Sequence, residues 1–238
     1  MLTSIILRNG INMESIVLLF SYLIAILSAI ILHEIAHGYA AYYNGDLTAK
    51  YAGRLSLNPL KHLDLIGFLM LLFCGFGWAK PVPIDSRNFK DYKKGMIMTS
   101  TAGVLCNFVQ AFLASICLAV FLKIIAPLSF TSKNALFYFL QFVLYIFYFS
   151  MQINIVLMVF NLLPLYPLDG FRIVETLATP NNKYVDFMYR HGRYALIIFI
   201  GLNYVIQLVS GYSLFGMVND LSQLIFNKVW GLILGVSI

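Results

Sequence analysis

The sequence predicts an all-α polytopic membrane protein with about five to six transmembrane helices. Of its 238 residues, 61% are hydrophobic and only 11% are charged, a balance far from that of a soluble globular domain. Long apolar segments recur along the chain, and several exceed the roughly 20 residues that a membrane-spanning helix needs. We therefore expect one integral-membrane domain over residues 1–238.

Three apolar segments are the expected core helices. The first covers about 16–43 and ends at Asn44-Gly45-Asp46, a sequence typical of a helix stop. The second and third cover about 96–125 and 135–163, with a proline and a short polar link between them. Each is long enough to cross a bilayer with some tilt.

The connection between the first two core segments is mixed in character. Residues 50–57 are a possible strand, and the apolar run 65–76 is too short to span alone, so it is expected to be re-entrant or interfacial. Residues 80–84 contain alternate prolines, which cannot donate to a β ladder and belong on a sheet edge or in a loop. Together these features predict a small membrane-associated β element between the first two core helices.

The chain beyond the third core segment is expected to be accessory. Pro164 and Pro167 end that segment, and Asp169 opens a short piece that continues to about residue 177. Two further apolar segments are expected to form a hairpin over about 194–235, turning at Ser210-Gly211.

Lysine and arginine concentrate in two connections. Eight lie between residues 44 and 94, and four lie between residues 164 and 193. Two crossings separate these connections and place them on the same side, which the positive-inside rule assigns to the cytoplasm. The N-terminus is then expected outside and the C-terminus inside. The net charge of +6 is interpreted as a topology signal, and nucleic acid is not an expected partner.

The first core segment contains His33, Glu34 and His37, although ionisable side chains are costly in a membrane and usually functional there. On a helix, two histidines four residues apart share a face and can bind one Zn²⁺. Glu34 lies beside them, where its carboxylate could accept a proton from water that the metal has acidified. The alternative, two hydrogen-bonded histidines and a snorkelling glutamate, leaves the cost of their burial unexplained.

A hydrolytic zinc site needs a third protein ligand and an open position for water. His62 and His191 lie in charged connections and are expected to be solvated. Asp169 follows the third core segment, on the side where the first one ends. The residues alone leave open whether Asp169 is a metal ligand or a helix N-cap.

Several segments of the chain resemble the site-2 proteases, which are intramembrane zinc metalloproteases. They are HEIAH at 33–37, AGVLCN at 102–107 and NLLPLYPLDG at 161–170, while GWAKPVP at 77–83 is similar to the short bacterial members. The resemblance implies that Asp169 is the third zinc ligand and that the three core helices form the catalytic core. It also implies the minimal type, without a PDZ or CBS domain.

Gly103 and Asn107 lie four residues apart on the second core segment, and Val104 stands where the family commonly has proline. Gly103 would allow close approach of a neighbouring helix. Asn107 would either bind the substrate and polarise its carbonyl or form an interhelical hydrogen bond, and both roles stay open.

The expected function is hydrolysis of peptide bonds within or near transmembrane segments of membrane proteins. An extended substrate could be held on a strand edge at 80–84 or 50–57, because a helix hides its own peptide bonds. Two alternatives are a divalent-metal transporter and a catalytically silent membrane binding protein. A transporter would not need Glu34 beside the histidines, and a silent protein would tolerate changes in His33, Glu34, His37 or Asp169.

Overall fold

The computed structural model describes residues 12–74, 77, 79–128 and 132–235. Within these residues the chain forms helices joined by turns and short 3-10 segments, and no strand. The α-helices are α2 (Met13–Tyr43), α3 (Thr48–Tyr51), α4 (Leu65–Cys74), α5 (Tyr92–Ile125), α6 (Ala135–Asn161), α7 (Asp169–Leu177), α8 (Lys183–Ser210) and α9 (Leu214–Leu234).

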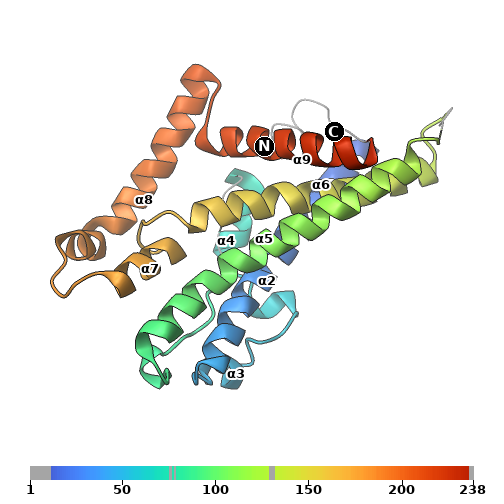
Figure 1. Cartoon of the computed structure of the whole chain (residues 1–238). Helices are drawn as coiled ribbons and strands as arrows, with labels where there is room; N and C mark the ends of the chain where they lie inside the picture. Colours follow the sequence, from blue (N-terminus) through green and yellow to red (C-terminus); the bar gives the residue numbers. More distant parts are fainter. Residues whose placement is uncertain (1–11, 75–76, 78, 129–131, 236–238) are drawn as a thin grey trace.

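Helices α2, α5 and α6 lie side by side at the centre of the molecule and pack against one another (Figure 1). Each begins at a capping side chain that accepts a hydrogen bond from a backbone N–H of the first turn, supplied by Asn12, Asp91 and Asn134. Helix α2 ends at Tyr43, and Gly45, with φ of 110°, turns the chain away from it.

Four helices are long and apolar enough to cross a membrane, namely α2, α5, α6 and α8. The prediction of an all-α polytopic membrane protein is therefore confirmed, but the described residues give four candidate spans and not the expected five to six. By the same length and composition, no other described helix qualifies, and α9 falls short because Asp220, Lys228 and several amides interrupt its apolar residues.

The prediction of a β element between α2 and α5 is wrong for the described residues. The candidate strand at 50–57 instead contains the end of α3, where Gly53 adopts a φ of 63°. Its N–H donates to the Lys50 carbonyl and that of Arg54 to the Ala49 carbonyl, each at 2.9 Å, which is the Schellman pattern of a helix end. A left-handed glycine at this point reverses the chain and prevents extended pairing.

A single antiparallel bridge joins Leu63 to Ala79, and the Lys80 N–H donates to the His62 carbonyl at 2.8 Å. These contacts hold together the two ends of the segment that carries α4. With ten residues, α4 rises about 15 Å, half of a bilayer core. The chain thus leaves and returns at one place, as a re-entrant segment requires. Residues 75 and 76 of the expected apolar run lie outside the described part.

The C-terminal helices differ from the expected hairpin. Helix α8 begins eleven residues earlier than expected, at Lys183, because the Asn182 side chain caps it. After the turn at Gly211, α9 packs on α6 and α5 rather than back along α8 (Figure 1). The polar side chains of α9 explain this, because Ser222 donates to Gln152 at 3.0 Å, Gln223 to Tyr148 at 2.8 Å and Trp230 to Ser115 at 3.3 Å.

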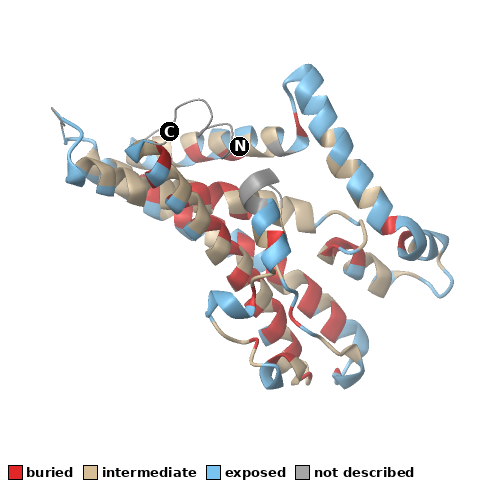
Figure 2. Cartoon of the chain, turned by 180° about the vertical axis from the view of Figure 1, so that it is seen from behind, coloured by how far each residue is buried: buried red, intermediate tan, exposed pale blue. Residues whose placement is uncertain are grey.

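Buried residues gather where α2, α5 and α6 meet, whereas α8 is exposed over most of its length (Figure 2). A second apolar cluster lies under α9, where Phe226 packs on Leu118 and Met151. The region where α2, α5 and α6 meet contains the two histidines of α2.

Candidate metal centre

Helix α2 presents His33 and His37 to α5, one turn apart on the same face. Both side chains are buried, with 7% and 6% of their surface exposed. Their Nε2 atoms are 2.9 Å apart, and the two rings meet edge to face. The spacing that the sequence predicts therefore brings two imidazole nitrogens to one point.

Each imidazole is oriented by an acceptor on α5. Nδ1 of His33 lies 2.9 Å from Oδ1 of Asn107, and Nδ1 of His37 lies 2.7 Å from the carbonyl oxygen of Thr99. An acceptor at Nδ1 favours the tautomer with its proton there, which leaves the lone pair on Nε2. Both rings are thus held with their ligating nitrogens toward one another.

Asp169 completes the cluster from the first turn of α7. Its Oδ2 lies 3.3 Å from Nε2 of His33 and 3.2 Å from Nε2 of His37. The N-cap position of α7 is Leu168, and no side chain forms a capping hydrogen bond there. The carboxylate of Asp169 is therefore directed to the histidines and is not used as a helix cap.

The three ligand atoms fit a zinc ion. Atoms that bind tetrahedral zinc at about 2.0–2.1 Å are roughly 3.3 Å from one another. The separations here are 2.9, 3.2 and 3.3 Å. Two buried lone pairs and a carboxylate oxygen in such contact repel one another unless a cation or a proton lies between them. Among the described residues, this is the one group of three metal-ligating side chains that converges in this way.

Close approach of α5 depends on Gly103. A Cβ at this position would lie 2.5 Å from Cε1 of His33 and 2.6 Å from Cε1 of His37, closer than any side chain tolerates. The glycine of the Gly103–Asn107 pair thus lets the helix backbone touch both rings, as its position in the sequence predicts.

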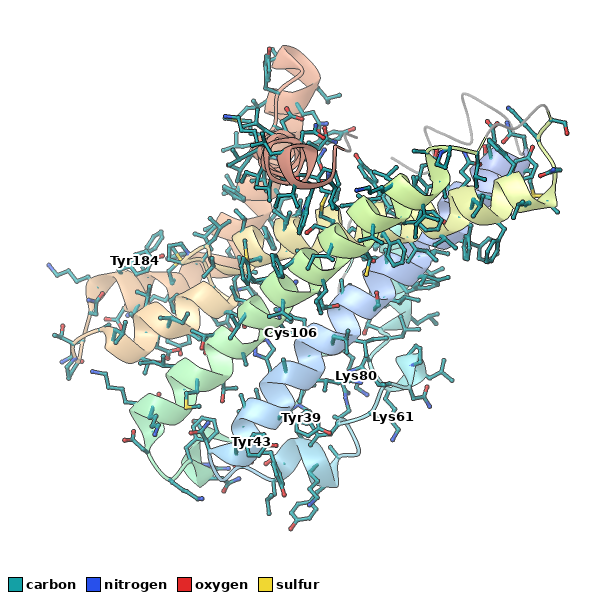
Figure 3. All side chains as sticks on the ribbon, turned by 45° about the vertical axis from the view of Figure 1, so that its right-hand side comes forward. Tyr39, Tyr43, Lys61, Lys80, Cys106 and Tyr184 are labelled. Carbon is teal, nitrogen blue, oxygen red and sulfur yellow. The ribbon has the colours of Figure 1, made fainter. Side chains whose placement is uncertain are left out.

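Aromatic packing fixes the piece of chain that carries Asp169. Phe171 is almost fully buried, and its ring meets Tyr166 and Tyr189 edge to face, with centroids 5.5 Å apart in each case. Tyr189 belongs to α8, as does Tyr184, whose hydroxyl donates to the Pro164 carbonyl. The first turns of α8 therefore pack against the segment that carries Asp169, a contact that sequence reasoning missed. Figure 3 labels Tyr184 on this helix.

Glu34 is half-buried on α2, on a different side from the two histidines. Its Oε2 accepts a hydrogen bond from the backbone N–H of Val82 at 2.9 Å. Sequence reasoning missed this contact and the one at the Thr99 carbonyl, because a backbone group has no residue type by which it could be found.

The two remaining histidines lie away from the cluster. His62 was expected to be solvated, which is wrong, since only 1% of its surface is exposed. Its Nε2 contacts the Ser56 carbonyl at 2.7 Å, and its ring lines a small cavity against Ile30 and Ile31 of α2, because the 54–63 loop folds onto that helix. His191 is exposed on α8, as expected.

Comparison with known proteins gives two matches and one negative result. The model of a protein family described as "Peptidase family M50" matches residues 21–199. A protein of Bacillus subtilis (strain 168), "Putative zinc metalloprotease YwhC", is 39% identical over 200 residues, which cover 82% of this chain and 84% of the Bacillus protein. No solved structure gives a significant match.

Proposed function

Because the chain belongs to peptidase family M50 and is an intramembrane zinc metalloprotease, we propose that His33, His37 and Asp169 hold its zinc and that Glu34 is its general base. The observation that carries this proposal is the convergence of three ligand atoms within 4.8 Å of one another. The three helices α2, α5 and α6 would then be the catalytic core of a single domain spanning residues 1–238.

Zinc bound by these residues supplies a Lewis acid that polarises a peptide carbonyl and acidifies water. Glu34 would take a proton from the attacking water on its carboxylate and pass it to the nitrogen of the leaving amine. The acceptors on α5 keep both imidazoles in the ligating tautomer throughout.

Asn107 is proposed to serve both the metal centre and the substrate. It is fully buried, and its Oδ1 contacts His33. Its Nδ2 has no hydrogen-bond partner among the described residues, although a buried donor normally has one. We propose that this amide donates to the carbonyl oxygen of the scissile bond, where negative charge develops.

The substrate is a membrane protein, and we propose that cleavage occurs in or near a locally unwound transmembrane segment. Of the two expected binding edges, 50–57 is ruled out by the turn at Gly53. In 80–84, the N–H groups of Lys80 and Val82 are already used, and Pro81 and Pro83 have none. An extended substrate at 80–83 would therefore pair by donating its own N–H groups to carbonyls of this segment.

The orientation is proposed from charge. The connections that follow α2 and α6 contain eight and four Lys or Arg, so we propose that the metal centre lies toward the cytoplasm and the N-terminus outside. Residues 1–11 lie outside the described part. A cytoplasmic C-terminus requires α9 to cross as a fifth span, and this remains a prediction.

The test compares wild type with Glu34→Gln on a membrane-spanning test substrate in liposomes. The glutamine keeps size and hydrogen bonding but has no basicity, so we expect zinc content to be unchanged and cleavage to fall at least about a hundredfold. Asp169→Asn should lower zinc content and cleavage together. Cleavage by Glu34→Gln at the wild-type rate would exclude Glu34 as the base.

A further inference from the structure

An extended segment, which we name the strap and define as residues 79–84, runs along α2 beside Glu34. Val82 is its buried member, and its side chain lies at Gly38, where a Cβ would be 3.4 Å from the Val82 Cγ1. Glu34 and Gly38 are one helical turn apart on the same face. With its side chain against Gly38, Val82 directs its N–H to the carboxylate of Glu34, 2.9 Å away.

The direction of this N–H is restricted by the sequence around it. Pro81 and Pro83 flank Val82, and each proline ring fixes its own φ while keeping the preceding residue extended. Pro81 and Pro83 have no amide N–H, so within residues 81–83 Val82 supplies the one backbone donor, and it reaches Glu34 of α2. The hydrogen bond to Glu34 therefore depends on where the strap is held.

Arg54 holds the strap. Its Nη2 donates to the carbonyl of Lys80 and, at 3.1 Å, to that of Pro81, the two residues that precede Val82. The guanidinium is buried, with 7% of the residue exposed, and its Nε has no partner among the described residues. No carboxylate in the described part of the chain pairs with this cation. Burial of an unpaired cation is costly, and we infer that the contact does more than close a loop.

Arg54 is itself anchored on α2. The glycine turn after α3 fixes its backbone, and the next residue, Leu55, packs at Gly38, where a Cβ would lie 2.5 Å from its Cδ2. Lys80 is further fixed by its N–H bond to the His62 carbonyl. Figure 3 shows Lys80 and Lys61 on the side of α2 away from α5. The strap therefore contacts α2 on the side opposite α5, the helix whose Asn107 and Thr99 contact the two histidines.

We propose that Arg54 is a positioning residue for Glu34, acting through the strap. Arg54 fixes the carbonyls of Lys80 and Pro81, the fixed strap aims the Val82 N–H, and that N–H holds Oε2 of Glu34 so that Oε1 is left to exchange the proton. A glutamate side chain has several rotamers of similar energy, and this contact selects one of them. The inference rests on the proposed role of Glu34 as the base.

The experiment uses the full-length protein in liposomes and measures kcat, KM and zinc content with a membrane-spanning test substrate. Arg54→Met removes the donors but keeps an unbranched side chain. Arg54→Lys keeps a cation that can donate to one carbonyl. Val82→Pro removes the N–H donor and exchanges the buried isopropyl group for a ring of similar size, in a segment already compatible with proline. Arg190→Met, at an exposed site on α8, is the matched control.

We expect Arg54→Met and Val82→Pro each to lower kcat by about 10- to 100-fold, the usual effect of losing a residue that orients a site, while zinc content and KM stay within about twofold. The double variant should be no slower than Val82→Pro, because both changes act through one hydrogen bond. Arg54→Lys should recover part of the rate, and Arg190→Met should match wild type.

A wild-type kcat for Val82→Pro, losses that multiply in the double variant, or zinc loss parallel to the loss of rate would each overturn the proposal. If Arg54→Met does not fold, Val82→Pro decides alone, since it retains the arginine. Glu34→Gln distinguishes failure of the proposed base from failure of the proposed positioning role. An active Glu34→Gln removes the proposed base itself, whereas an inactive Glu34→Gln with a fully active Val82→Pro removes only the positioning role.

Discussion

Gly103 is the residue on which contact between α5 and the two histidines depends. Because a Cβ would lie 2.5 Å from the His33 ring, Gly103→Ala must displace an imidazole ring or the helix. We expect zinc affinity to fall by about 10- to 100-fold, as when a ligand loses its orientation. Competition with a chelator measures this. Gly201→Ala on α8, where a Cβ meets nothing within 4 Å, is the control and should bind zinc as wild type does.

The two functions proposed for Asn107 can be separated by single substitutions. Asn107→Asp retains an oxygen for His33 but loses the Nδ2–H donor, so we expect zinc to be retained and kcat to fall by about 100- to 1,000-fold, the effect of losing an oxyanion donor. Asn107→Leu loses both functions and should also bind zinc more weakly. Undiminished cleavage by Asn107→Asp would leave the asparagine with only its contact to His33.

At the scale of elements, the turn after α2 is organised by Asp46. This carboxylate is fully buried and accepts hydrogen bonds from the Thr48 N–H at 3.0 Å, the Asn88 amide at 2.9 Å and the Asp85 N–H at 2.8 Å, as well as from the Thr48 hydroxyl. Burial alone would raise the pKa of Asp46, but these donors outweigh it and hold the pKa below its ordinary value of 3.8. Asp46 therefore ties the end of α2 to the residues that precede α5.

The lowered pKa predicts how stability depends on pH. A carboxylate with a depressed folded-state pKa stabilises the protein above its unfolded pKa, and the effect is lost as pH falls through the folded value. We expect Asp46→Asn to lower the free energy of unfolding by about 1–3 kcal/mol at neutral pH and the difference to shrink below about pH 4. Thermal unfolding in detergent measures this, with Asp220→Asn at an exposed site of α9 as the control. A difference that persists unchanged at about pH 3 would contradict the argument.

For the whole molecule, the testable property is orientation. Lys61 lies in the basic connection after α2, and Lys133 lies between α5 and α6 at the other end of the helices, where it pairs with Glu14. With the basic connections in the cytoplasm, an impermeant thiol reagent added to intact cells should label Lys133→Cys and not Lys61→Cys. Both should react after the cells are opened. The reverse pattern would invert the protein and the side from which its substrates are cut.

The sequence by itself determined the class of molecule and most of the chemistry. Runs of apolar residues required helices, because a backbone in lipid must satisfy its own hydrogen bonds, and α2 ends at Tyr43, where the sequence places a stop. The four-residue spacing of His33 and His37 put both rings on one face, and the resemblance implied Asp169 as their partner. These are local periodicities and residue types, which a sequence displays directly.

Tertiary structure alone decided which groups meet these residues. The Thr99 carbonyl at His37 and the Val82 N–H at Glu34 are backbone groups, which almost any residue type would supply at these positions. The burial of His62 and the contacts of Arg54 follow from a loop that folds onto α2, while charge in the sequence indicated a solvated surface. Such contacts join residues distant along the chain, and their geometry is fixed by packing that no local pattern encodes.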